Sequence, residues 1–127
     1  MAPVLLYAGL LGLIALVLSV NVTMLRGKKK ILFGDGGDRE LMFAIRRFGN
    51  FAEYAPLGLI LLGLASAGGA VGWFIHAAGI ALVAGRVIHP LGIKDGTGVP
   101  VPRGVGQLLT WLMIAATSVY LLFIYFG

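Results

Sequence analysis

The sequence predicts an all-α integral membrane protein, a single domain of residues 1–127 arranged as an up-down bundle of four transmembrane helices. Its 127 residues are 59% hydrophobic and only 12% charged, whereas soluble domains are about half apolar and a quarter charged. Four apolar segments each reach the ~20 residues that a helix needs to cross a bilayer. Glycine or proline interrupts the chain between all of them, as expected for loops at a membrane surface.

The four expected spans follow from this pattern in order. The first covers residues 3–25, and a basic cluster follows its apolar stretch, which indicates a retained span and not a cleaved signal peptide. The second, third and fourth spans cover residues 41–64, 70–89 and 105–126. One edge of the third span carries small residues, which favour close packing of another backbone: Ala77, Ala81 and Gly85.

Basic residues are concentrated in two of the three loops and predict the orientation. The first loop carries five and the third carries two, while the second loop carries no charge: Arg26, Lys28, Lys29, Lys30 and Arg39, then Lys94 and Arg103. The positive-inside rule therefore predicts that the first and third loops are cytoplasmic and that both termini lie outside. The compact chain, with no obvious retention signal, favours a bacterial inner membrane.

Composition and spacing exclude several kinds of function. The chain has no cysteine, so it has no disulfide, thiolate metal site or cysteine nucleophile. Seven of its ten basic residues flank the spans and three lie within them, and they form no basic patch interleaved with aromatic residues, so we expect no nucleic-acid partner. His76 and His89 are too far apart along one helix to share a metal, and we expect no metal site. A lone histidine near a helix end, such as His89, is more typical of a surface residue than of a ligand.

A stripe of polar residues in the second span is the main candidate for function. Successive helical residues advance by about 100°, so Arg46, Asn50 and Glu53 fall within an arc of about 60°. At ~1.5 Å per residue, Glu53 lies roughly 18 Å into the span, close to the middle of the bilayer. A charge at that depth costs at least ~2.5–3.5 kcal/mol and needs a partner or water.

Two interpretations of this stripe remain open. It could join helices, with Arg46 or Arg86 pairing with Glu53 and Asn50 bonding a backbone group. It could instead bind an anion, because four arginines near the cytoplasmic half of the spans outnumber the single acid at Glu53: Arg46, Arg47, Arg86 and Arg103. Lipid phosphate could meet part of that surplus. Because unpaired buried charge is the costly state, the surplus favours a site for a small anionic molecule.

Three motifs resemble those of a known family. The stretch "RRFGNFAEYAP" is similar to the second-helix motif of the MAPEG family, the membrane-associated proteins in eicosanoid and glutathione metabolism. "GRVIHPLG" at the end of the third span and "RGVGQLLT" at the start of the fourth support the resemblance. The family includes microsomal glutathione transferases, the leukotriene-forming glutathione conjugase, microsomal prostaglandin E synthase and the lipoxygenase-activating protein.

The resemblance implies a homotrimer of four-helix subunits that binds glutathione between neighbouring subunits near the cytoplasmic face. It implies glutathione-binding roles for residues on three helices: Arg26, Arg46, Asn50, Glu53, Tyr54, Arg86 and His89. Arg103 falls where some members place the arginine that lowers the pKa of the glutathione thiol. Two positions depart from the conjugases, because His89 and Ile93 stand where those enzymes have tyrosines.

The chemistry of the residues agrees with that resemblance. Glutathione carries two carboxylates, which suit arginines, and one ammonium group, which suits Glu53. A guanidinium near the thiol favours the nucleophilic thiolate. We therefore expect a membrane-bound glutathione transferase or glutathione-dependent peroxidase, with glutathione as co-substrate and a hydrophobic small molecule or lipid as second substrate.

Three alternatives stay open. The chain could bind lipid or glutathione without catalysis, or it could be a small transporter or channel subunit that uses its arginines as an anion path. Arg103 could also simply mark the cytoplasmic boundary of the fourth span, as most arginines at span ends do. Other membrane lipids are expected as partners around the bundle.

Overall fold

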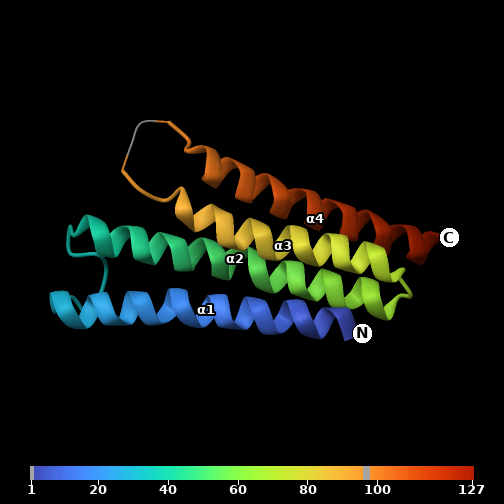
Figure 1. The fold of residues 1–127 in the computed structure, drawn as a ribbon, viewed down its shortest axis with the longest axis horizontal. Coiled ribbons are helices and arrows are strands. Elements are labelled where there is room, and N and C mark those ends of the chain that lie inside the picture. Colours follow the sequence, from blue (N-terminus) through green and yellow to red (C-terminus); the bar gives the residue numbers. More distant parts are fainter. Residues whose placement is uncertain (1, 96–97) are drawn as a thin grey trace.

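The computed structural model describes residues 2–95 and 98–127 and consists of four helices joined by three connections (Figure 1). They are α1 (Ala2–Lys29), α2 (Arg39–Ala67), α3 (Gly72–Leu91) and α4 (Val101–Phe126). All four are long and apolar enough to cross a membrane. The predicted all-α class with four such helices is therefore confirmed.

The helices differ from the predicted spans mainly at the polar end. α1 and α2 extend through charged residues beyond the apolar windows, because a helix does not need to end where the hydrocarbon does. α2 begins after Asp38, whose side chain accepts a hydrogen bond from the Leu41 amide at 2.8 Å and caps the helix. α4 begins at Val101 and therefore includes Arg103 in its first turn. α3 begins only at Gly72, because Ala70 and Val71 belong to the connection from α2.

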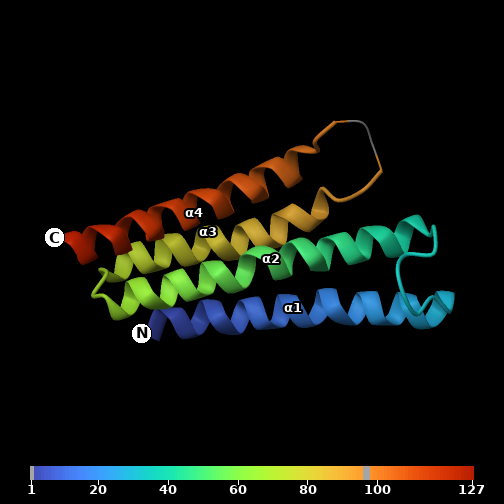
Figure 2. The same ribbon diagram turned by 180° about the vertical axis from the view of Figure 1, so that it is seen from behind.

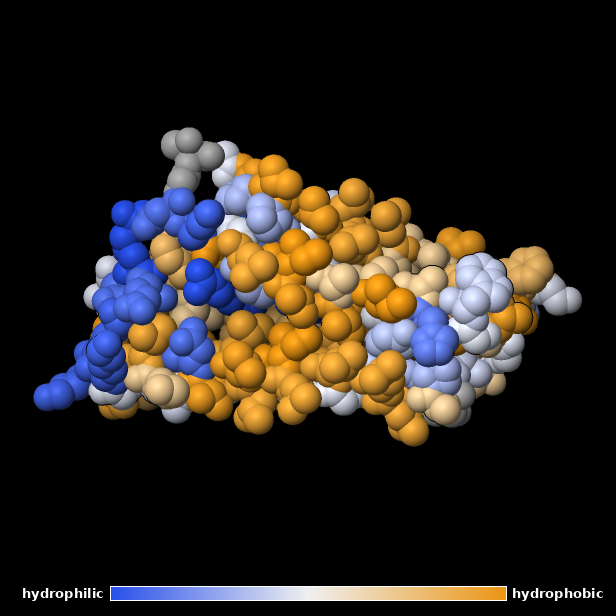
Figure 3. Space-filling model, viewed as in Figure 1, coloured by the Kyte–Doolittle hydropathy of each residue, from blue (hydrophilic) through white to orange (hydrophobic). Residues whose placement is uncertain are grey.

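The helices alternate in direction along the bundle. Both termini and the short α2–α3 turn lie at one end, while the α1–α2 and α3–α4 connections lie at the other (Figures 1 and 2). Every pair of helices packs together except α1 and α4, which have no contact within the described residues. The face drawn in Figure 3 is largely hydrophobic, and its strongly hydrophilic residues gather at the end that carries these two connections.

Two glycines allow α3 and α4 to approach most closely. A Cβ atom on Gly106 would lie 2.6 Å from the His89 amide nitrogen and 2.7 Å from the Gly85 carbonyl oxygen. Both are backbone atoms, so no side-chain rotation could make room. The close packing expected at the small edge of the third span is confirmed at Gly85, whereas Ala77 is exposed.

Charged residues tie the connections together at the polar end. Lys29 forms ion pairs with Asp38 at 2.7 Å and Glu40 at 2.9 Å, which join the end of α1 to the start of α2. Arg39 forms an ion pair with Asp95 and so links α2 to the connection after α3. This end of the bundle, where the candidate site lies, is held by contacts among all three segments.

Candidate functional site

A buried arginine in α3 organises the polar interior. Arg86 is only 1% exposed. Its Nη1 donates to the Asn50 side-chain oxygen at 2.6 Å, and its Nε donates to Thr110 Oγ1 at 3.1 Å. Its Nη2 donates to the Gly106 carbonyl at 3.3 Å. One side chain thus fixes α2, α3 and α4 relative to one another and sets the orientation of the Asn50 amide.

No carboxylate within the described residues forms an ion pair with Arg86. Its partners are neutral oxygens, together with the Tyr54 ring, whose centroid is 5.3 Å from the guanidinium carbon. Glu53 is exposed on α2 and also has no ion pair among the described residues. The pairing of Glu53 with Arg46 or Arg86, which the interhelical interpretation required, is therefore not found within the chain.

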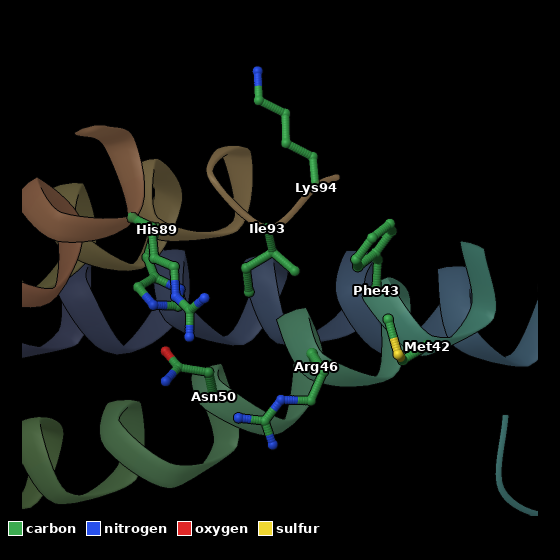
Figure 4. A pocket seen from close by; sticks show the side chains of 8 residues that line it. Met42, Phe43, Arg46, Asn50, His89, Ile93 and Lys94 are labelled. Carbon is green, nitrogen blue, oxygen red and sulfur yellow. The ribbon is translucent and has the colours of Figure 1, made fainter. Parts of the chain in front are cut away.

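The first of two adjoining cavities is strongly cationic. It has a volume of about 200 Å³, and of the eight described residues that line it, three are basic and none is acidic: Met42, Phe43, Arg46, Asn50, His89, Ile93, Lys94 and Arg103. Figure 4 shows Asn50 and His89 on facing sides, with Arg46 further along α2 and Lys94 extending away. A small anion with several acceptor oxygens fits this lining.

The second cavity lies between α2 and the first turns of α4. It has a volume of about 350 Å³ and shares Asn50, His89 and Arg103 with the first cavity. Its remaining lining is mostly uncharged and includes aromatic rings: Tyr54, Val99, Gly104, Gln107, Leu108 and Trp111. Leu108 and Trp111 are more than half exposed on the outer face of α4, so this cavity opens toward the surface that lipid would cover.

His89 lies at the boundary of the two cavities. It is only 3% exposed, so the expectation of a surface residue at the end of the third span was wrong. The close approach of α4 at Gly106 explains the difference, because the Gly106 backbone packs directly against the His89 backbone and Cβ. The sequence indicates that His89 lies at the end of α3, but the segment that covers His89 belongs to α4.

The family of this chain follows from its similarity to known proteins. Residues 4–123 match the sequence profile of the MAPEG family. This chain belongs to the MAPEG family. The resemblance drawn from the second-helix motif is therefore confirmed, and the chain is a membrane protein of that family.

Two relatives of this MAPEG chain are inner membrane proteins. Over 87 residues the chain is 41% identical to inner membrane protein YecN of Escherichia coli K12 and, to the same degree, to YecN of Escherichia coli O6:H1. The match covers 68% of this chain and 66% of each relative, slightly less than two thirds of their length. No solved structure matches the chain.

The structure brings together most of the residues that the MAPEG resemblance implied. Asn50, Tyr54, His89 and Arg103 line the cavities, and Arg86 holds Asn50 from behind. Arg46 also lines the first cavity. The polar stripe on α2 is therefore split between a cavity wall and an outer surface.

Three charged residues lie outside the two cavities: the predicted site residues Glu53 and Arg26, and Arg47, which is next to Arg46. Glu53 lines neither cavity and faces the exterior of the chain. Arg26 donates to carbonyls of its own loop, including Gly34 at 2.8 Å, and also lines neither cavity. Arg47 donates to the carbonyls of Pro90 at 3.2 Å and Ile93 at 2.6 Å, which ties α2 to the end of α3.

Sequence reasoning missed two α4 residues of the site. Thr110 is fully buried, accepts from Arg86 and donates to the Gly106 carbonyl at 2.9 Å. Gln107 lines the second cavity, and neither polar atom of its buried amide has a hydrogen-bond partner among residues 2–95 and 98–127. Both residues lie in "RGVGQLLT", and two polar side chains three positions apart, which share one face of a helix, were the available signal.

Proposed function

We propose that this MAPEG protein is a membrane-bound glutathione transferase or glutathione-dependent peroxidase that acts on hydrophobic electrophiles. Glutathione occupies the cationic cavity near the cytoplasmic face, at a subunit interface of a homotrimer in the inner membrane. The observation that carries the proposal is a lining with three cationic residues and no acid, beside an arginine held only by neutral groups.

The charge of the cavity fits the charge of the tripeptide. Arg46 and Arg103 are planar cations that can each bind a carboxylate through two hydrogen bonds. The Asn50 amide adds a neutral donor and acceptor, and its oxygen is already engaged by Arg86 at 2.6 Å. The nitrogen of that amide therefore remains the part of Asn50 that is available to an anionic ligand.

The exposed position of Glu53 supports an interface site. A carboxylate left facing hydrocarbon would cost at least ~2.5–3.5 kcal/mol. A neighbouring subunit would remove Glu53 from lipid, and an ammonium group of a ligand at that interface would give it a charged partner. Arg46 is exposed on the same helix, so it can contact a ligand from the cavity side of that interface.

Arg103 is the residue proposed to activate the thiol. It lies in the first turn of α4, where the helix N-terminus adds a positive potential of the same sign as its guanidinium. A guanidinium is a planar cation with several N–H donors, so it can stabilise a nearby thiolate through charge and hydrogen bonds. Arg103 lines both cavities, so a thiolate held beside it faces the cavity that opens toward the bilayer.

The cellular location rests on loop charge and on the relatives. The two charged connections lie at the same end of the bundle as the cavities, and the positive-inside rule assigns that end to the cytoplasm. In this proposal glutathione binds from the cytosol, and the cavity lies at the cytoplasmic end of the bundle. The inner-membrane name of the YecN relatives supports the same membrane for this chain.

Calorimetry in detergent, followed by turnover assays, tests the proposal. Glutathione is titrated into the purified protein, and conjugation of 1-chloro-2,4-dinitrobenzene and reduction of cumene hydroperoxide are then measured. We expect binding together with at least one of the two reactions. Binding without either reaction would support the non-catalytic alternative, and absence of binding would refute the proposed function.

A matched pair of variants assigns the binding to the cavity. Arg46→Ala removes a cation from the cavity wall, whereas Lys28→Ala removes one from the exposed end of α1. Loss of a charge-assisted contact is expected to weaken binding about tenfold or more in Arg46→Ala. Lys28→Ala should leave the dissociation constant nearly unchanged, and equal weakening in both variants would indicate only a general charge effect.

A further inference from the structure

We infer that Thr110 is a positioning residue for the anion site, which acts through Arg86 and makes Asn50 turn its side-chain N–H toward the ligand. The inference rests on the proposed function and adds a residue that lies outside the lining of both cavities. It starts from three side chains on three helices, which hydrogen bonds join in the order Thr110, Arg86 and Asn50.

The Thr110 hydroxyl is oriented so that it accepts from Arg86. Its hydrogen is engaged within α4, because Oγ1 donates to the Gly106 carbonyl, one turn earlier, at 2.9 Å. The lone pairs of the oxygen are therefore left for Arg86, whose Nε donates to Oγ1 at 3.1 Å. A guanidinium has donors only, so the two groups are complementary. Thr110 is fully buried, so water does not replace this bond.

Two bonds to one turn of α4 fix the plane of the Arg86 guanidinium. Nε donates to Thr110, and Nη2 donates to the Gly106 carbonyl at 3.3 Å. Because a guanidinium is planar and rigid, two fixed nitrogens determine where the third one points. Nη1 then reaches Asn50 on α2, where it contacts the side-chain oxygen at 2.6 Å and the main-chain oxygen at 3.4 Å. The direction of Arg86 is thus set by α4 and acts on α2.

Asn50 carries the effect of Arg86 into the cavities. Asn50 is half-buried and lines both cavities, whereas Arg86 lines neither of them. If the amide turned over, its oxygen would face the anion and its NH₂ group would face the guanidinium, which has no acceptor. Accepting a hydrogen bond from a cation also polarises the amide, so its N–H becomes a stronger donor. An anion therefore interacts with the charge of Arg86 through Asn50, without touching Arg86.

The experiment compares Thr110→Val with a matched variant of the same helix, Thr117→Val. Thr117 is also fully buried, and its hydroxyl donates to the Met113 carbonyl at 2.8 Å, as that of Thr110 does to Gly106. Thr117 lines neither cavity. We expect the dissociation constant of glutathione, measured by calorimetry, to rise at least about fivefold in Thr110→Val and less than about twofold in Thr117→Val. Thr110→Ser keeps the hydroxyl and should restore the affinity of the parent.

A double-mutant cycle separates positioning from a general structural role. In Asn50→Ala the amide is gone, so Thr110→Val should weaken glutathione binding by less than about a further twofold in that background. A structural role would give the same factor in both backgrounds. The same factor in both, or equal weakening by Thr110→Val and Thr117→Val, would overturn the inference. If Thr110→Val does not assemble, Thr110→Ala and Thr117→Ala take the place of the two valine variants.

A second probe, inorganic sulfate, distinguishes failure of the inference from failure of the proposed function. If the parent binds glutathione and Thr110→Val binds it as tightly, the role of Thr110 is wrong and the proposed function stands. If the parent binds sulfate with the expected dependence on Thr110 but does not bind glutathione, the proposed function is refuted and the role of Thr110 stands. If the parent binds neither probe, both are refuted.

Discussion

The contact between α3 and α4 can be tested by adding one methyl group at Gly106. Gly106→Ala places a Cβ atom 2.6 Å from the His89 amide nitrogen and 2.7 Å from both the Gly85 carbonyl oxygen and the His89 Cβ. Ordinary contacts of a Cβ atom begin at 3.4 Å. The two helices would therefore have to separate by roughly 0.7–0.8 Å, because two of these atoms belong to the α3 backbone and the third, the His89 Cβ, is bonded directly to it.

The expected magnitude follows from a comparison with Gly104 in the same helix. A Cβ atom on Gly104 has its nearest neighbour at 4.0 Å, at Val99 Cγ1. Both substitutions gain the helix preference of alanine over glycine, which is up to ~1 kcal/mol. Only Gly106→Ala adds the cost of overpacking, about 1–3 kcal/mol. We therefore expect Gly106→Ala to be less stable than Gly104→Ala by about 1–3 kcal/mol.

Thermal unfolding of both variants in the same detergent measures this difference. We expect Tm of Gly104→Ala to equal or exceed that of the parent, and Tm of Gly106→Ala to lie clearly below that of Gly104→Ala. Separation of the helices would also lengthen the bond from Arg86 to the Gly106 carbonyl, now 3.3 Å, and move Arg103 away from Asn50. Equal Tm values in the two variants would refute the close packing of α3 on α4.

Three further predictions concern the site, the orientation and the polar end. Glu53→Gln should stay folded but bind glutathione at least about tenfold more weakly in calorimetry, because a desolvated charged pair contributes ~2–5 kcal/mol; unchanged affinity would remove Glu53 from the site. A cysteine at Lys28 should be shielded from an impermeant thiol reagent in intact cells while one at Gly127 reacts, and the reverse pattern would overturn the orientation. The hydrogen bond from Lys29 holds the pKa of the Asp38 carboxyl below its ordinary value. A lowered pKa in the folded protein contributes stability above the unfolded pKa and loses it as pH falls through the folded one. Asp38→Asn should therefore lower Tm at neutral pH and approach the parent only after the pH has fallen below the lowered pKa of the folded protein; a difference in Tm that persists at the acid end of the titration would contradict this.

The helices could be predicted because each depends on local sequence. Apolar length alone indicates four segments that can cross a bilayer. The starts of α2 and α4 lie before the apolar segments, at the local cap Asp38 and directly after Pro100. The stripe of Arg46, Asn50 and Glu53 was also visible, because it needs only the helical period. The partners of these three residues could not be predicted, because the helical period does not indicate which helix covers each part of the stripe.

The site depends on contacts between helices that are distant in sequence. Arg86 of α3 bonds to Asn50 of α2 and to α4, so its partners depend on how three helices pack together; Gly85 and Gly106 allow the close approach of α3 and α4. The same approach buries His89, and among the described residues the Gln107 amide has no hydrogen-bond partner. None of these three outcomes follows from one helix alone, which is why the sequence predicted the residue types of the site but not its division into two cavities.

The thiolate absorbance of bound glutathione tests the central claim most directly. Glutathione is added to the protein at neutral pH, and the ultraviolet difference spectrum is recorded for the parent, for Arg103→Ala and for Lys94→Ala. Lys94 lines the first cavity but extends away from it, so it controls for loss of one positive charge (Figure 4). A free thiol has a pKa of ~8.5, and each unit of lowering reflects about 1.4 kcal/mol of preferential thiolate stabilisation. We predict a saturable thiolate band in the parent and in Lys94→Ala that is lost in Arg103→Ala while glutathione still binds; a parent saturated with glutathione but without this band, or an equal band in all three proteins, would contradict the proposed activation by Arg103.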